Sequence, residues 1–265
     1  MNYFTITNMS IYKDKTFAEY WNERAGEVGE VYKRFVLDPL LFNELGSFKG
    51  KTVLELGCGN GYLAKKFLID GVEKLILADI SEHNLEYASQ KVDSPKVQFL
   101  LQDATKTWQM DEQSVDVIYS NMMLNEVEDI QSVCTEAFKA LKPGGVFAFS
   151  TTHPAWDLFI YAQQRAGVEP RKVKGLGGYF RRGYSKFIMG TDDPSSEHTK
   201  KRDEKFEVEH YQRPISDYFA AVKGAGFNIE KFIEPPLTKE ILEAAPRFQD
   251  YSDRPISMVL ICSKP

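Results

Sequence analysis

Short apolar runs alternate with helical patterns between about residue 50 and residue 150. The apolar runs are rich in Val, Ile, Leu and Phe, and the segments between them repeat apolar residues at helical spacing. Their apolar character is continuous, as is typical of strands buried on both faces of a parallel sheet. The pattern predicts right-handed βαβ units, with strands over 51–56, 74–79, 96–102, 114–120 and 146–150 and helices over 61–70, 81–91 and 129–141.

The flanking segments have different patterns. Two helical patterns, 17–24 and 31–45, precede the first strand, and Asp38-Pro39 interrupts the second. After Ser150 the rhythm breaks, and Gly, Pro and charge clusters follow with little helical period. A helix over 214–226 and strands over 227–233 and 256–263 complete the predicted elements.

These elements predict an α/β fold. We expect a Rossmann-like, doubly wound, mostly parallel seven-stranded sheet with helices on both faces. The predicted organisation is an N-terminal helical lid over 1–48, a core over 49–152 and 213–265, and an inserted substrate cap over 153–212.

Composition narrows the class of protein. The 265 residues are 43% apolar, enough for a sizeable core. No apolar run approaches the roughly 20 residues of a membrane helix, and Met1–Lys15 lacks the apolar stretch of a signal peptide. The three cysteines are widely spaced, so we expect a cytoplasmic protein without disulfides or a metal site. A net charge of −5 disfavours non-specific nucleic-acid binding.

The most specific motif is the segment Val53–Gly61, VLELGCGNG, at a strand-to-helix turn. Glycines at such a turn allow positive φ and close approach of a ligand to backbone amides, and the following helix N-terminus favours an anionic group. A dinucleotide fingerprint requires a glycine where Tyr62 stands, so the spacing argues against a nicotinamide-dependent oxidoreductase.

Acidic residues accompany the turn at three strand ends. Glu55 lies two residues before the first glycine, and Asp79 ends the second predicted strand. A carboxylate at the position of Asp79 can accept hydrogen bonds from both hydroxyls of a ribose. Asp103 ends the third predicted strand, at the same carboxyl edge of the sheet.

In this order the motifs resemble class I S-adenosylmethionine-dependent methyltransferases with a small-molecule, type 11/25-like domain. The matching segments are Glu55–Gly61, Asp79-Ile80-Ser81, Gln102-Asp103-Ala104, Asp116–Asn121 and Leu141–Gly145. The resemblance implies that the glycine loop holds the methionine part of the cofactor, Asp79 the ribose and Asp103 the adenine amino group. The implied cofactor-binding set is Glu55, Gly57, Gly59, Asn60, Gly61, Asp79, Ile80, Ser81, Asp103, Ala104, Ser120, Asn121 and Met122, with Tyr12 and Trp21 as a lid.

Purely structural interpretations of these residues stay open. The glycines also suit a tight structural turn, Asp103 a strand-end turn, and Ser81 a helix N-cap. Turn and helix-start roles suit Asn121, Asn125 and Glu126. Tyr12 and Trp21 equally suit a core, and we expect Cys58 to serve packing.

Methyl transfer is an in-line displacement at the sulfonium methyl, so positioning supplies much of the catalysis. A general base helps only if the nucleophile loses a proton. The candidates are His153, which follows the fifth predicted strand, and His210 with its neighbour Tyr211, which precede the last helix. An ordinary loop histidine before proline is the alternative for His153.

The predicted cap contains a basic, aromatic stretch. Arg171–Thr191 has six basic residues and no acidic one, which favours a mobile cap for an anionic or aromatic acceptor. A solvated hairpin is the alternative.

The predicted function is transfer of the sulfonium methyl from S-adenosyl-L-methionine to O, N or C of a small molecule, leaving S-adenosyl-L-homocysteine. The alternatives are an RNA or protein methyltransferase and a non-catalytic regulatory protein that binds the cofactor. We expect no nucleic-acid or membrane partner, and a monomer or homodimer.

Overall fold

The computed structural model describes residues 9–156, 179–190 and 205–265. A seven-stranded sheet has the order β3-β2-β1-β4-β5-β9-β8. Strands β1 to β5 run parallel, and β9 is antiparallel to both of its neighbours. This confirms the predicted mostly parallel sheet, whose strands are β1 Thr52–Leu56, β2 Lys74–Asp79, β3 Val97–Leu101, β4 Val115–Asn121, β5 Leu141–Thr152, β8 Asn228–Ile233 and β9 Ser257–Ser263.

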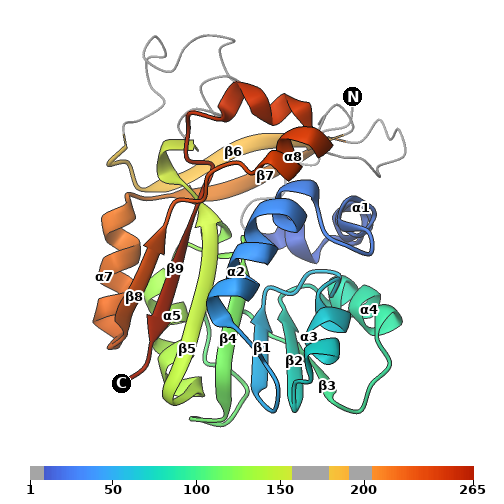
Figure 1. Cartoon of the computed structure of the whole chain (residues 1–265), viewed down its shortest axis with the longest axis vertical. Helices are drawn as coiled ribbons and strands as arrows, with labels where there is room; N and C mark the ends of the chain where they lie inside the picture. The colour runs from blue at the N-terminus through green and yellow to red at the C-terminus, as the bar shows by residue number, and fades with distance from the viewer. Residues whose placement is uncertain (1–8, 157–178, 191–204) are drawn as a thin grey trace.

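Helices cover both faces of the sheet (Figure 1). Residues of α2, α3, α4 and α8 pack in one buried cluster, and residues of α5 and α7 pack in another. The helices are α1 Lys15–Ala25, α2 Asp38–Leu45, α3 Ala64–Asp70, α4 Glu82–Lys91, α5 Ile130–Ala140, α7 Ile215–Ala225 and α8 Lys239–Ala244. The short turns are 3₁₀ helices η1 Met9–Lys13, η3 Leu124–Glu126 and η5 Pro246–Tyr251 and the π-helical η2 Lys33–Leu37.

Helix starts agree with local chemistry. Asp14 accepts a hydrogen bond from the Phe17 amide at 2.9 Å, and Asp129 accepts one from the Ser132 amide at 2.9 Å. Ser81 caps α4 by accepting from the Asn84 amide at 3.3 Å. These side chains replace hydrogen bonds that the first helical turn lacks. None of the described helices has both the length and the apolar character of a membrane span.

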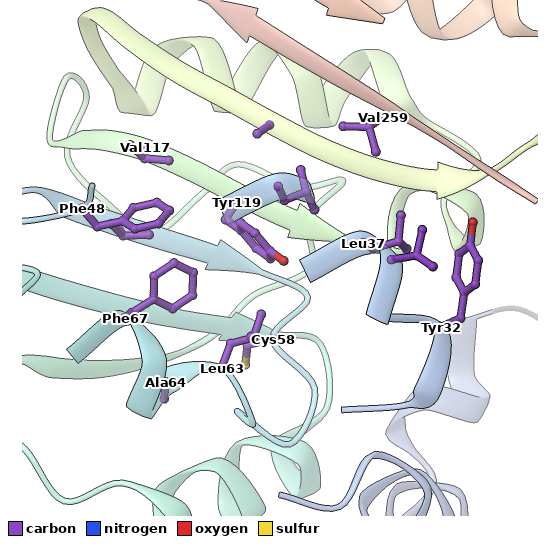
Figure 2. Packing of buried hydrophobic residues seen from close by; sticks show 14 of the residues in the cluster. Tyr32, Leu37, Phe48, Cys58, Leu63, Ala64, Phe67, Val117, Tyr119 and Val259 are labelled. Carbon is purple, nitrogen blue, oxygen red and sulfur yellow. The ribbon is translucent and has the colours of Figure 1, made fainter. Parts of the chain in front are cut away.

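The first buried cluster joins the helices before β1 to the sheet. Figure 2 shows Leu37, Phe48, Phe67 and Tyr119 in this cluster, which also contains Val259 of β9. The Phe67 and Tyr119 rings meet edge to face, with centroids 5.5 Å apart. Because these residues are far apart in sequence, burying them together fixes α2 and α3 on the sheet.

The predicted lid segment divides into two parts. Leu37 of η2 and Leu41 of α2 are fully buried in the first cluster, so both helices are part of the core. In contrast, α1 packs through Phe17 and Tyr20 against Phe206, outside the sheet. The predicted lid segment therefore contributes η2 and α2 to the core, whereas α1 packs against β7 (Lys205–Gln212).

The predicted cap contains a hairpin that sequence periodicity did not reveal. Strands β6 Gly183–Gly190 and β7 Lys205–Gln212 pair antiparallel with each other. The hairpin crosses the end of the sheet at which the parallel strands terminate (Figure 1). The alternation of apolar and polar residues over 205–209 was the missed signal. Residues 157–178 and 191–204 of the predicted cap, which include residues 171–178 and Thr191 of the basic stretch, lie outside the described residues, as do residues 1–8.

Candidate functional site

The glycine-rich turn links β1 to α3 at the carboxyl edge of the sheet. Gly57, Gly59 and Gly61 have φ of +76°, +55° and +69°. A Cβ on Gly57 would lie 2.6 Å from Met123 Cγ, and one on Gly61 would lie 2.7 Å from Ala88 Cβ. The turn therefore requires glycine for its dihedral angles and, at these two positions, also for space.

Asp79 holds the turn from the end of β2. One carboxylate oxygen accepts a hydrogen bond from the Gly59 amide at 2.8 Å. The other accepts from the Ser81 amide at 2.9 Å and from Asn84 Nδ2 at 3.3 Å. Burial raises the pKa of Asp79, and these donors act in the opposite direction. A carboxylate at this position already organises the backbone against which a ligand would lie.

The carboxyl group of Glu55 is buried, and one of its oxygens accepts no hydrogen bond from the described residues. Its side chain is 3% exposed, and among the described residues its Oε2 has no hydrogen-bond partner. Burial and the charges of Asp38 and Asp79 raise its pKa well above the ordinary value, whereas Lys33 lowers it. A buried oxygen without a donor is costly, so this position favours a ligand that supplies a donor.

Asp103 forms a turn at the end of β3, which was the structural alternative to a role in binding adenine. Its Oδ1 accepts from the Thr105 amide at 2.9 Å and from Thr105 Oγ1 at 2.7 Å. The neighbouring Ala104 carbonyl accepts from Trp108 Nε1 at 3.0 Å. These bonds fix the chain just after β3, where an adenine was expected to bind.

Residues at the end of β4 tie neighbouring strands together. Ser120 is fully buried and donates to the Leu56 carbonyl at 2.9 Å. Ser150 of β5 donates to Asn121 Oδ1 at 2.6 Å and accepts from the Met122 amide at 3.0 Å. Met122 adopts a φ of +58°, which is rare for a side-chain-bearing residue and marks an enforced turn after β4.

A buried aspartate that the sequence analysis did not assign connects these parts. Asp38 accepts hydrogen bonds from Tyr62 of the turn at 3.0 Å, from Tyr119 at 2.9 Å and from Asn121 at 2.6 Å. Burial raises the pKa of Asp38 to about 6. The only sequence signal was an Asp-Pro pair inside a helical pattern.

We expect Asp38 to make stability depend on pH. A carboxyl group whose pKa is higher in the folded state loses stability as pH rises from its unfolded pKa, near 4, through about 6. The unfolding free energy of Asp38→Asn minus that of the wild type should therefore increase by up to about 3 kcal/mol as pH rises from about 4 to about 7. Urea unfolding across this range is the measurement, and parallel pH curves for the two proteins would contradict the expectation.

Helix α1 is latched to the glycine turn. Asn60 Nδ2 donates to Asn22 Oδ1 and to the Gly26 carbonyl, each at 3.0 Å. The position of a Cβ on Gly59 lies 3.2 Å from Trp21 Nε1, so the indole lies directly against the turn. The Tyr12 ring meets the Phe17 ring edge to face, with centroids 5.3 Å apart. Trp21, one of the two predicted lid residues, therefore lies beside the turn.

Lys33 is a further residue that sequence patterns did not reveal. It lies on η2, and its ammonium donates to the Asn121 carbonyl at 3.1 Å. The same ammonium lies 5.5 Å from the centroid of the Trp21 ring. Burial lowers the pKa of Lys33, and the charges of nearby acidic residues oppose this.

The structure separates the three candidate bases. His210 Nε2 lies 2.9 Å from Glu126 Oε1 of η3, which follows β4. His153 Nε2 lies 2.9 Å from Glu234, after β8, and its Nδ1 accepts from the Ala155 amide at 3.1 Å. The Tyr211 ring meets Tyr184 edge to face at 5.0 Å. Because alternate residues of a strand point to opposite faces, Tyr211 points away from His210.

Arg213 holds the His210–Glu126 contact in place. Its guanidinium donates to the carbonyls of Val127 and Glu128, the latter at 3.1 Å. The guanidinium also lies 4.5 Å from the Tyr211 ring. Since Arg213 follows β7 and binds the residues after Glu126, it fastens the hairpin to the turn after β4.

Comparison with known proteins supports one family. Residues 54–149 match the family model described as a methyltransferase domain. A ubiquinone biosynthesis O-methyltransferase from Hydrogenovibrio crunogenus is 31% identical over 147 residues, 55% of this chain and 61% of that protein. A malonyl-[acyl-carrier protein] O-methyltransferase from Ilyobacter polytropus is 28% identical over 207 residues, 75% of this chain and 72% of that protein. The chain spans about three fifths of the length of the first curated relatives that it matches.

A solved structure extends the similarity to the whole fold. A proposed S-adenosylmethionine-dependent methyltransferase from Listeria monocytogenes aligns with a TM-score of 0.68 and 25% identity, covering 86% of this chain and 96% of that one. The family match agrees with the strand order, with the glycine-rich turn and with the buried acidic residues at the ends of β1 and β2. Residues 54–149 therefore match a methyltransferase domain, and the fold is that of the class I S-adenosylmethionine-dependent methyltransferases.

Proposed function

We propose that this protein transfers the sulfonium methyl of S-adenosylmethionine to an oxygen, nitrogen or carbon atom of a small molecule. The observation that carries the proposal is the three-glycine turn flanked by buried Glu55 and Asp79 at adjacent strand ends. A ligand with an anionic carboxylate and cationic groups suits backbone amides on one side and carboxylates on the other.

Each part of the cofactor has a proposed partner. The unpaired Glu55 Oε2 would accept from the ammonium of the methionine part. Asp79 would exchange part of its bonding to the turn for the ribose hydroxyls. Asp103 would face the adenine, and the Trp21 indole would cover the methionine part from α1. The cofactor supplies the activated methyl group, and the chain holds it and excludes water.

His210 is the proposed general base among the three candidates. Glu126 of η3, the turn that follows β4, holds its Nε2. Asn125 donates to the same Glu126 oxygen at 2.6 Å, so the carboxylate is fixed from two directions. A histidine oriented by a carboxylate suits proton removal from a hydroxyl or amine acceptor. His153 is instead anchored to the segment after β8.

The described residues support an anionic acceptor only weakly. Arg182 binds Asp217 through two hydrogen bonds of 2.6 Å and 2.7 Å, and Lys186 lies 2.6 Å from Glu207. Such charges are largely neutralised by their partners. The relatives named as O-methyltransferases favour an acceptor with a reactive oxygen, and we propose an aromatic small molecule as the class to screen first, followed by an anionic one.

Calorimetric titration with S-adenosylhomocysteine, and separately with NAD, tests the cofactor site. We expect micromolar binding of S-adenosylhomocysteine, at least about tenfold weaker binding in Asp79→Ala, and no binding of NAD. Asp93→Ala, which changes an exposed aspartate, is the control and should bind as the wild type does. Absence of S-adenosylhomocysteine binding by the folded wild-type protein would refute the proposed site. Binding without turnover across a broad acceptor screen would favour a regulatory role instead.

A further inference from the structure

Lys33 lies among groups that attract cations. Its ammonium donates to the Asn121 carbonyl and lies over the Trp21 ring. The acidic residues that act on it are Glu30, Asp38, Glu55 and Glu126, and each favours its charged form. Glu30 precedes η2, Asp38 lies in α2, Glu55 in β1 and Glu126 in η3. The Asn121 carbonyl belongs to β4 and Trp21 to α1.

We use the term cation box for the Trp21 ring, the Asn121 carbonyl and the carboxylates of Glu55 and Glu126. An aromatic face, a carbonyl dipole and carboxylates are the groups that bind onium ions in proteins. The cation box adjoins the glycine turn, because Trp21 lies against Gly59 and Glu55 precedes Gly57 by two residues. The cofactor site proposed above therefore includes the box.

The cofactor and its product differ in charge at one atom. S-adenosylmethionine carries a positive sulfonium, whereas S-adenosylhomocysteine has a neutral thioether in the same place. A lysine ammonium in the box repels the first and leaves the second nearly unaffected, and the repulsion is stronger in a partly buried site than in water.

We propose that Lys33 competes with the sulfonium for the cation box and thereby sets the affinity for cofactor relative to product. When S-adenosylmethionine binds, the Lys33 ammonium and the sulfonium repel each other in the box. When S-adenosylhomocysteine binds, this repulsion is absent. This inference rests on the proposed function, because it places the cofactor beside the glycine turn.

The same repulsion would assist the reaction. As the acceptor atom bonds to the methyl carbon, the carbon–sulfur bond breaks, its electron pair passes to sulfur, and the sulfonium loses its charge. A cation beside sulfur destabilises the ground state more than the transition state, which lowers the barrier. Replacing Lys33 by a neutral residue should accordingly tighten cofactor binding and lower kcat.

Titration of the full chain with S-adenosylmethionine and S-adenosylhomocysteine tests the competition without a known acceptor. In Lys33→Met, affinity for S-adenosylmethionine should rise about tenfold, and affinity for S-adenosylhomocysteine should stay within about twofold. Lys33→Arg retains the charge and should retain the wild-type ratio. Lys66→Met is the matched control, since Lys66 also lies over an aromatic ring, at 3.8 Å from the Phe42 centroid, but is exposed.

The outcomes separate this inference from the proposed function. Equal changes in the two affinities of Lys33→Met, or weaker binding of S-adenosylmethionine, would overturn the role of Lys33 and leave the cofactor site intact. Absence of binding by either ligand to the wild type would overturn the proposed function. Lys33→Gln, which keeps a donor for the Asn121 carbonyl, provides the same comparison if Lys33→Met does not fold.

Discussion

His210→Asn should lower kcat by about 10²- to 10⁴-fold for an acceptor that loses a proton, with little change in affinity for S-adenosylhomocysteine. Nε2 of His210 lies 2.9 Å from Glu126, and Arg213 fastens the turn that carries Glu126 to strand β7. Removing the imidazole removes the proposed proton acceptor but leaves the residues of the proposed cofactor site in place. Release of S-adenosylhomocysteine during turnover of an identified acceptor is the measurement.

His153→Asn is the matched control for this prediction. His153 is buried like a catalytic residue, but its partners Glu234 and Ala155 belong to other segments than the turn after β4. Its replacement should change kcat by no more than a few-fold. Glu126→Gln should lower kcat and flatten the rise of rate with pH, whereas Glu126→Asp should restore part of the activity. A large loss in His153→Asn together with an active His210→Asn would assign the base to His153.

Gly61→Ala should destabilise the protein by about 2–4 kcal/mol and abolish cofactor binding at ordinary concentrations. The residue has a φ of +69°, and a Cβ there would lie 2.7 Å from Ala88 Cβ and 3.1 Å from Ala88 Cα. Helix α4 or the glycine turn has to move, and either movement displaces the amides that face the ligand. Chemical unfolding and calorimetric titration measure the two effects.

Two variants separate crowding from backbone strain. Gly144→Ala has a comparable φ of +76° with nothing within 4 Å of the new Cβ, so it should cost only about 1 kcal/mol. Ala88→Gly in the Gly61→Ala background removes the nearest atom and should recover part of the lost stability. Equal losses in Gly61→Ala and Gly144→Ala would show that contact with Ala88 is unimportant.

Local patterns along the chain were enough to predict much of the fold. The strands β1 to β4, the helices α4, α5 and α7 and the glycine turn lie within a few residues of their predicted positions. Strand β5 begins at Leu141, earlier than predicted, because Leu141 already pairs with Val115 of β4. The Pro-Gly segment that follows Leu141 forms an irregularity before the pairing resumes at Val146. These features depend on side-chain periodicity, capping and glycine dihedral angles, which act over a few neighbouring residues.

Other features followed from contacts between distant residues. Tyr119 is 81 positions from Asp38, and Asn121 is 83 positions from it, so the hydrogen bonds around Asp38 leave no local pattern. The same holds for Glu126 beside His210 and for Lys33 beside the Asn121 carbonyl. The antiparallel pairing of β9 with β5 likewise depends on the return of the chain after α7.

The sequence by itself therefore determined the α/β class, the cofactor family and the acidic residues at the strand ends, because each is encoded by neighbouring residues and their order. Only the tertiary structure decided which histidine meets the turn after β4, which half of the N-terminal segment is core, and which cation lies beside the Asn121 carbonyl. Packing of the sheet and helices brings those groups together, and burial then determines how strongly their charges interact.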